Sequence, residues 1–503
     1  MKPRSVLTNT VSVAASLVLI GCSSVAHLAP ESPSRPWQQA GESPQKPMIT
    51  PKFGVRPDPE LPYNEERVSI AADHVYTLPE LIDLAERANP DTRIAWEEAQ
   101  QAAFQVGIER ASYLPQISAE VLAGKHYEPL PLPPGSYFIA KGDDLEPDFM
   151  IKWLLFDFGK REAQIDAAKE LSVASNIAFT GAHQKLIFEV SKAYFYLDAV
   201  RAQLRVAEDA LKNANTLLDA AGARRRHGFE TITEVTIARR GTAKAQYDLE
   251  RARLLDNDGY HALLEAMGLT PTLRLGIESS SGRPLPKELT EEVSAYIDRA
   301  TVQRPDVVAA LAKVRASESE IAKAQAEFYP TLELKGRAGR NFAPVSIDLA
   351  SVYQAPSGPS YKIDDWVTSI SLNLSFSIYD GGIRQHNVSI ANSKSAAAKE
   401  ELIRTQDQAV RQVARAYDTM RSTLAEYNAA LALVDAANTA YASALESYRN
   451  GVGTFIDAVT AETEKAHAES ARAQAYAAAL TAAATLAFST GTLTSVEALN
   501  SSP

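Results

Sequence analysis

The chain has 503 residues, and its 62 acidic and 51 basic residues give a formal net charge of −11. This balance leaves no basic excess to bind phosphate groups, which argues against nucleic acid as a partner. Cys22 is the only cysteine, so a disulfide framework and a cysteine-based zinc site are both excluded.

Residues 1–21 have the pattern of a secretory signal, with Lys2 and Arg4 ahead of an apolar run. The sequence Leu-Ile-Gly-Cys at 19–22 resembles the bacterial lipobox, in which the cysteine is acylated and becomes the first mature residue. We therefore expect lipid on Cys22. Ser23 follows in place of an aspartate, which by resemblance to lipoprotein sorting rules favours the outer membrane. An ordinary signal peptide with an incidental cysteine is the alternative. Residues 22–75 are rich in proline, which fixes φ and lacks a backbone donor, and this predicts an extended tether.

Residues 76–275 form the first of two similar halves. Thr77 and Asn89 each start a predicted helix. Alternating apolar and polar residues then predict strands at about 116–124 and 149–157, with a proline-rich loop between them. Apolar residues at steps of three and four follow, and they predict a long helical hairpin over about 160–267.

The second half, residues 276–495, repeats this order. Arg304-Pro305-Asp306 answers Asn89-Pro90-Asp91 at an offset of 215 residues, and Asn450-Gly451 answers His227-Gly228 at an offset of 223. The repeat predicts strands at about 331–340 and 366–378 and a second hairpin at about 383–490, before a tail at 496–503. Each long helix, at 1.5 Å per residue, would extend roughly 100 Å.

Four strands with one polar and one apolar face cannot close a barrel, because about eight strands are the practical minimum. Their predicted lengths suit a tilted membrane strand, and an open sheet in lipid would leave backbone groups unpaired. Three copies would supply twelve strands. The alternative is a soluble four-stranded sheet that carries a coiled-coil arm.

These features together resemble the TolC-like outer-membrane efflux protein family, in its lipid-anchored branch. The resemblance covers about residues 76–495 and rests on the Asn/Arg-Pro-Asp helix starts, the Tyr-Pro strand starts, the Asp-x-Gly and Asp-Gly-Gly rod starts and the Gly-x-x-Thr-x-x-acid tips. It implies a mixed α+β membrane protein built from two internal repeats. The implied assembly is a trimeric, 12-stranded transmembrane β-barrel, four strands per chain, continued by a long periplasmic α-helical barrel.

The resemblance also implies a function and partners. The chain would be the outer-membrane channel-tunnel of a tripartite efflux system in a Gram-negative bacterium, a homotrimer exporting small toxic compounds. Its partners would be outer-membrane lipid, a periplasmic adaptor (membrane fusion) protein and an inner-membrane pump of the resistance-nodulation-division or ABC type. Export of polypeptides by a type I-like secretion system, or a non-conducting coiled-coil surface scaffold, are the alternatives.

No motif for catalysis is present in the sequence, which has no phosphate loop, nucleophile elbow or His-Glu-x-x-His helix. We therefore expect no enzyme activity, no cofactor and no metal site.

The hairpin tips are the candidate functional site. In the family they narrow to close the tunnel with acids near the start of the last long helix. Asp457 takes the first such position and Thr460 stands where a second can occur. A tyrosine before this turn can bond an acid in the first repeat's tip, and these positions are Tyr448 and Glu234. The tip turns themselves comprise Gly228, Thr231, Gly451, Gly453 and Thr454.

Two features of the sequence weigh against a complete gate at these tips. Gly453 stands where some relatives carry an arginine of the same lock, so the full lock is not expected here. In addition, Glu234 and Asp457 each lie three residues after a threonine, the spacing of a capping box, so both acids could serve only to start their helices. Threefold symmetry, which would bring three Asp457 carboxylates around one axis, favours a gate at that position.

Overall fold

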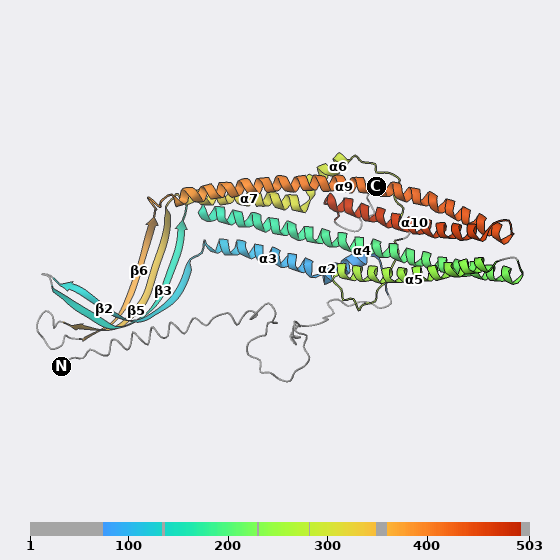
Figure 1. Ribbon diagram of the computed structural model, residues 1–503. Helices are drawn as coiled ribbons and strands as arrows, with labels where there is room; N and C mark the ends of the chain where they lie inside the picture. Colours follow the sequence, from blue (N-terminus) through green and yellow to red (C-terminus); the bar gives the residue numbers. More distant parts are fainter. Residues whose placement is uncertain (1–73, 133–135, 229–230, 281, 349–359, 494–503) are drawn as a thin grey trace, which may run out of the picture. The chain divides into compact units, whose positions relative to one another are not determined.

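The computed structural model describes residues 74–132, 136–228, 231–280, 282–348 and 360–493 (Figure 1). The predicted signal, Cys22, nearly all of the predicted tether and the tail lie outside these residues. The elements in chain order are β1 (Val75–Tyr76), α2 (Leu78–Ala88), α3 (Pro90–Ala111), β2 (Gln116–Leu132), β3 (Ser136–Phe156), α4 (Lys160–Arg226), α5 (Ile232–Met267), β4 (Gly276–Ile277), α6 (Val293–Gln303), α7 (Pro305–Ala326), β5 (Thr331–Asp348), β6 (Ser360–Ser375), α9 (Ile383–Arg449) and α10 (Phe455–Ser489).

The two halves of the chain match element by element. Helices α3 and α7 have 22 residues each, and the long helices α4 and α9 have 67 each. Both long helices follow a strand and return through a short turn into α5 or α10, as the repeat predicts (Figure 1). Of the described helices, none combines the length and apolarity that crossing a membrane requires.

Helices α3 and α7 begin with similar sequences, but different side-chain contacts stabilise the two helix starts. Before α3, the Asn89 side chain accepts a hydrogen bond of 2.8 Å from the Asp91 amide. Before α7, Arg304 instead forms an ion pair of 2.7 Å with Asp306 and donates to the carbonyl of Ser489 at 3.0 Å. In both halves, the proline after this residue occupies the first helical turn, where its missing N–H has no partner to lose.

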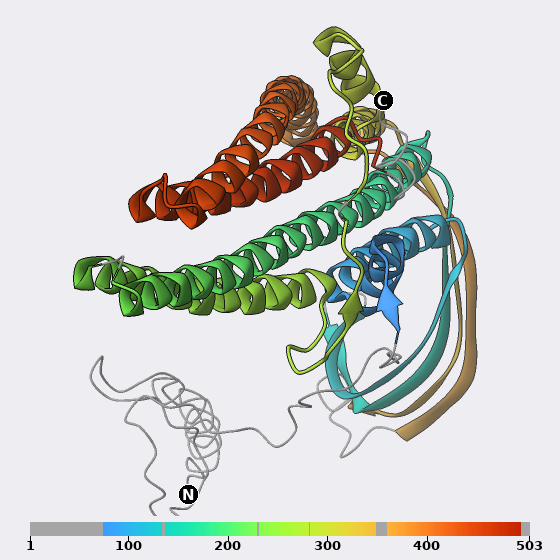
Figure 2. The same ribbon diagram turned by 90° about the vertical axis from the view of Figure 1, so that its right-hand side faces the viewer.

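The four long strands form one antiparallel sheet in the order β2-β3-β5-β6, and Figure 2 shows them side by side as a curved layer. A second, two-stranded sheet pairs β1 with β4 in parallel and so joins the starts of the two halves. The sequence did not indicate these two short strands.

The long strands extend well beyond the predicted ranges. The proline-rich loop expected after 124 is wrong in part, because β2 continues through Pro129 and Pro131 to Leu132. In the single chain β2 is an edge strand, so a proline there interrupts no ladder on its outer side. Pro147 lies within β3 where the pairing with β5 is interrupted, between Gly142 and Asp148. Strand β6 likewise begins at Ser360 and ends at Ser375, earlier than expected at both ends.

The strand register assembles two distinct faces, because residues directly opposite each other share a face. One face is apolar across neighbouring strands: Ile117 pairs with Ile151, and Leu334 pairs with Leu372. The other face is largely polar: Gln116 lies opposite Lys152, and Lys335 lies opposite Ser371. The apolar face is exposed in the single chain, with Ile117 73% and Ile370 77% accessible.

An ion pair fixes the junction between β3 and α4. Arg161 and Asp157 lie 3.1 Å apart and both side chains are less than a tenth exposed. The guanidinium also donates to the carbonyls of Ser112 and Leu154, at 3.1 and 2.6 Å. Asp380 and Arg384 form the equivalent pair before α9, at 2.7 Å. The sequence indicated the two turns but not the role of these arginines, although they too are related by the 223-residue offset.

Candidate functional site at the helical-hairpin tips

The tips of the two hairpins share one apolar cluster. It brings together residues of α4 and α5 from the first half with residues of α9 and α10 from the second. Its buried members are Leu217, Ala221, Val235, Ala238, Tyr448, Phe455 and Ala458. Because the cluster joins all four helices, a displacement at one turn would be transmitted to the other hairpin through packed side chains.

Tyr448 is the largest side chain of this cluster and is 2% exposed. Its ring meets the Phe455 ring edge-on, with centroids 5.6 Å apart. The Arg224 guanidinium lies over the Tyr448 ring, 5.1 Å from its centroid, and donates to the Tyr448 carbonyl at 3.4 Å. Tyr448 therefore lies in the cluster at the tips, and its role in a gate stays a prediction. Arg224 is an additional tip residue. The sequence did not single it out, because it belongs to a run of arginines of the kind that is favourable at a helix C-terminus.

Glu234 closes the first tip as a helix cap. Its carboxylate accepts a hydrogen bond of 2.8 Å from the Thr231 amide, and the Glu234 amide donates 3.4 Å to the Thr231 hydroxyl. The residue after it, Val235, lies in the same cluster as Tyr448. The structure thus brings the two predicted partners to one tip, and a bond between Glu234 and Tyr448 stays a prediction.

Asp457 forms the equivalent cap in the second tip. The Thr454 amide and hydroxyl donate to Asp457 Oδ2 at 3.2 and 2.6 Å. These hydrogen bonds, that of the hydroxyl first, hold the pKa of the Asp457 carboxyl below its ordinary value, because they favour the charged form. The side chains of Asp457 and Thr460 are both exposed, and residues three apart lie on one helix face. The carboxylate is thus ionised and open to solvent.

The turns require glycine for two different reasons. Gly228 and Gly451 adopt φ values of 82° and 77°, the left-handed conformation that ends a helix without side-chain strain. Gly453 has no such φ. Its amide donates 3.0 Å to the Ser447 carbonyl, and a Cβ at 453 would lie only 2.9 Å from the Ser447 Cβ. An arginine at this position would therefore require the turn to shift, which agrees with the absence of the full lock.

Glu462 is a partly buried acid near the tip that was not predicted from the sequence. Glu462 lines a cavity of about 560 Å³ between α4, α5 and α10, together with Lys244 of α5. Burial raises the pKa of the Glu462 carboxyl above its ordinary value, and a hydrogen bond from Asn213 and the nearby Lys465 partly oppose this shift. Helical spacing could have indicated this position, because Glu462 is one helical turn beyond the buried Ala458. It therefore lies on the packed side of α10.

The solved structure of the Campylobacter jejuni CmeC outer membrane channel has the same fold, with a TM-score of 0.68 at 20% identity over 88% of this chain and 94% of that one. Strands with an exposed apolar face, two 67-residue helices and their glycine turns define the subunit of an outer-membrane efflux channel. The chain belongs to the Outer membrane efflux protein family, whose sequence profile matches residues 81–269 and 296–492.

Curated relatives agree with this assignment. The chain is 26% identical to Outer membrane protein OprJ of Pseudomonas aeruginosa, over 76% of this chain and 78% of the relative. It is 23% identical to Cation efflux system protein CusC of Escherichia coli O157:H7, over 76% and 78%. The chain is thus the outer-membrane channel of a tripartite efflux system, and the family consists of efflux proteins and not of enzymes.

Proposed function

We propose that three copies of this chain form a continuous channel-tunnel, and the observation that carries this is the open sheet. Strands β2 and β6 are its edges, and its apolar face is exposed. Four strands are too few to close on themselves, and unpaired edges are costly in lipid. Three chains joined edge to edge would give twelve strands, an apolar outer wall and no free edge.

The polar face of the sheet suits the inner wall of such a barrel. Arg337 donates to Asp148 at 2.8 Å and to Glu146 at 2.9 Å. Charged side chains of this kind belong in a water-filled lumen, because the lipid face would impose a desolvation cost. The long helices of three chains would continue the lumen into the periplasm, with the tips as its far end.

The exposed tips are the surface that a periplasmic adaptor protein would cover. Ile232, Val452 and Ile456 are 57%, 83% and 60% exposed beside the glycine turns. Because apolar side chains grouped at a helix end favour a partner, we assign them to contact with the adaptor. The energy for export would come from an inner-membrane pump of the resistance-nodulation-division or ABC type.

Asp457 would form the ring that narrows the closed tip. Three ionised carboxylates around one axis repel one another and attract cations, so they would hold water and cations in the constriction. Thr460 continues the same face, and the packing of Tyr448 beside the start of α5 supports a role in holding the tips together.

The chain would also be anchored through lipid on Cys22, supported by the lipobox-like sequence that precedes it. Labelling cells with a fatty-acid analogue should mark the wild type and leave Cys22→Ser unmarked. Equal labelling of the two would end this assignment. Since the barrel has its own affinity for the membrane, the variant should retain some insertion.

Small toxic compounds are the proposed cargo, and the name of the CusC relative extends the candidates to metal cations. Deleting the gene in a host without a second such channel should increase sensitivity to at least one compound of a panel of antibiotics, detergents, dyes and metal salts. Unchanged sensitivity together with loss of a secreted polypeptide would replace this proposal with a secretion channel.

A further inference from the structure

Arg340 of β5 is a charged residue on the apolar face of the four-stranded sheet. It follows Leu334 at an even spacing, along a stretch that pairs with β6 without a break, so both side chains lie on one face. Its direct partner on β6 is Trp366, which is 72% exposed. Under the channel-tunnel proposal, on which this inference rests, this is the face that meets lipid.

Two aromatic rings hold the Arg340 guanidinium. Its central carbon lies 4.9 Å from the centroid of the Phe342 ring and 5.9 Å from that of the Trp366 ring. Both rings belong to the same face of the sheet as the arginine. A ring contacts the flat face of a guanidinium and uses none of its five N–H donors, which lie in the plane of the group. The rings therefore fix the plane in which these donors point.

The position of Arg340 along β5 corresponds to a membrane boundary. At the helix-proximal end of the sheet, Phe158 stacks on Tyr329 with centroids 5.3 Å apart, just before β5 begins at Thr331. Arg340 is nine residues beyond Thr331, which is about 23 Å of depth at roughly 3.3 Å per residue and a tilt of about 40°. The apolar bands of membrane barrels are about 25 Å tall, with aromatic girdles at both edges. Arg340 and Trp366 thus lie at the edge that is remote from the helices.

The face becomes charged beyond this edge. Lys125 of β2 lies further from the helices than Arg340 in the register of the sheet, on the same face as Ile117. It is exposed and pairs with Asp143 at 3.5 Å. An arginine is costly at the centre of a bilayer and nearly neutral at its interface, so a place at the end of the apolar stretch avoids this cost. At an interface, the groups that Arg340 meets are lipid head groups.

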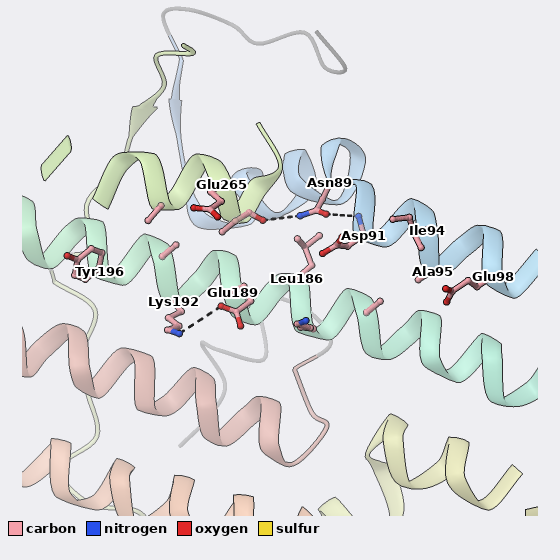
Figure 3. Close-up of a pocket in the computed structure, with 15 residues that line it drawn as sticks. Asn89, Asp91, Ile94, Ala95, Glu98, Leu186, Glu189, Lys192, Tyr196 and Glu265 are labelled. Carbon is pink, nitrogen blue, oxygen red and sulfur yellow. Dashed lines mark hydrogen bonds and ion pairs between the residues drawn. The ribbon is translucent and has the colours of Figure 1, made fainter. Parts of the chain in front are cut away.

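The helical part of the chain presents lysines in a different setting. A groove of about 720 Å³ lies between α3, α4 and α5 (Figure 3). Its charged residues are the lysines Lys185 and Lys192 and the acids Asp91, Glu98, Glu189 and Glu265. Figure 3 shows Lys192 paired with Glu189, at 4.0 Å. Because the acids outnumber the lysines, this groove would repel a phosphate group.

We propose that Arg340, held by Phe342 and Trp366, binds a phosphate group of the phosphorylated glycolipid in the outer leaflet of the membrane. A guanidinium matches phosphate with two parallel hydrogen bonds, and their attraction is stronger at the edge of an apolar layer than in bulk water. The Trp366 ring suits the same depth, because an indole has an apolar body and a polar N–H. Three copies of the chain would place three such sites around the outer rim of the barrel.

Binding of a phosphorylated glycolipid to the purified three-chain protein tests this site. The probe is lipid A, the bisphosphorylated anchor of lipopolysaccharide, and the comparison is the same lipid after enzymatic removal of its phosphates. Native mass spectrometry in mild detergent counts the lipids bound per particle as the lipid concentration rises. Wild type should bind the phosphorylated form about ten-fold more tightly, the effect of one charge-assisted contact. Equal binding of the two forms by wild type would overturn the site.

Arg340→Gln should lose the preference for the phosphorylated lipid and keep its three-chain mass. The matched control is Lys335→Gln, which removes a positive charge from the opposite face of the same strand and should bind as wild type does. A preference retained in Arg340→Gln, or lost equally in Lys335→Gln, would overturn the site. Displacement of lipid A by an equal concentration of inorganic phosphate would also overturn it, because a simple anion site needs no lipid.

Trp366→Leu keeps the arginine and removes one of the two rings. It should lower the preference about three-fold, the effect of one partly exposed cation–π contact, and an unchanged preference would contradict the role given to the rings. The oligomer mass separates this inference from the channel proposal. Three-chain particles without a preference for the phosphorylated lipid would refute the site alone, whereas single chains would refute the trimer and the lipid-facing surface together.

Discussion

The Thr454 hydroxyl donates a hydrogen bond of 2.6 Å to Asp457 Oδ2, and the Asp457 amide donates one of 3.2 Å back to the Thr454 hydroxyl. Thr231 and Glu234 repeat this reciprocal arrangement in the first tip. Both acids therefore start helices, whatever else they do. A gate at the tip has to be tested with changes that keep the cap and remove the charge.

Asp457→Asn is such a change, because asparagine can still accept a hydrogen bond from Thr454 but carries no charge. We expect single-channel recordings to show weaker preference for cations and weaker block by divalent or trivalent cations. Asp457→Ala should do the same and also destabilise the start of α10. Selectivity and block unchanged in Asp457→Asn would mean that the residue serves only as a cap.

Glu234→Gln should have a smaller effect on selectivity than Asp457→Asn, but should raise the frequency of channel opening if Glu234 bonds Tyr448. The matched control is Thr231→Ala, which removes the hydroxyl from the same cap and should lower the free energy of unfolding by about 0.5–2 kcal/mol. Equal opening frequencies in wild type, Glu234→Gln and Thr231→Ala would contradict a role for Glu234 in the lock.

Glu462→Gln should stabilise the protein at neutral pH. The folded-state pKa of Glu462 lies above its ordinary value of 4.5, so the folded chain binds the proton more tightly than the unfolded chain does. Its contribution to stability is full below pH 4.5 and is lost as the pH rises through the higher folded pKa. Thermal unfolding should therefore separate variant from wild type at pH 7 and bring them together below pH 4.5. The exposed Glu464, changed to glutamine, is the control, and the same behaviour there would refute this explanation.

Arg161→Met should destabilise the protein by about 3–5 kcal/mol, because it leaves the Asp157 carboxylate buried without its charged partner. The carbonyls of Ser112 and Leu154 would lose their donor as well. Arg384→Met is the matched control at the equivalent, more exposed pair, and denaturant unfolding should show a smaller loss there. Equal losses at the two sites would contradict the role assigned to burial.

The sequence predicted the long helices and strands well because each produces a periodic pattern of apolar residues. Helical spacing located α4 and α9, and alternation located the centres of the four long strands. The end of β2 was misplaced because proline was expected to end the strand, whereas β2 is an edge strand in the single chain and continues through Pro129 and Pro131. Arg224 and Glu462 were missed because their roles come from packing between hairpins, which no local pattern records.

Ion current through the purified protein in a planar lipid bilayer tests the central claim most directly. Protein whose mass in mild detergent is that of three chains should produce discrete openings that prefer cations, even if they are small while the tips are closed. Inserted three-chain protein with no current above that of the bare bilayer would contradict a conducting channel and favour a surface scaffold.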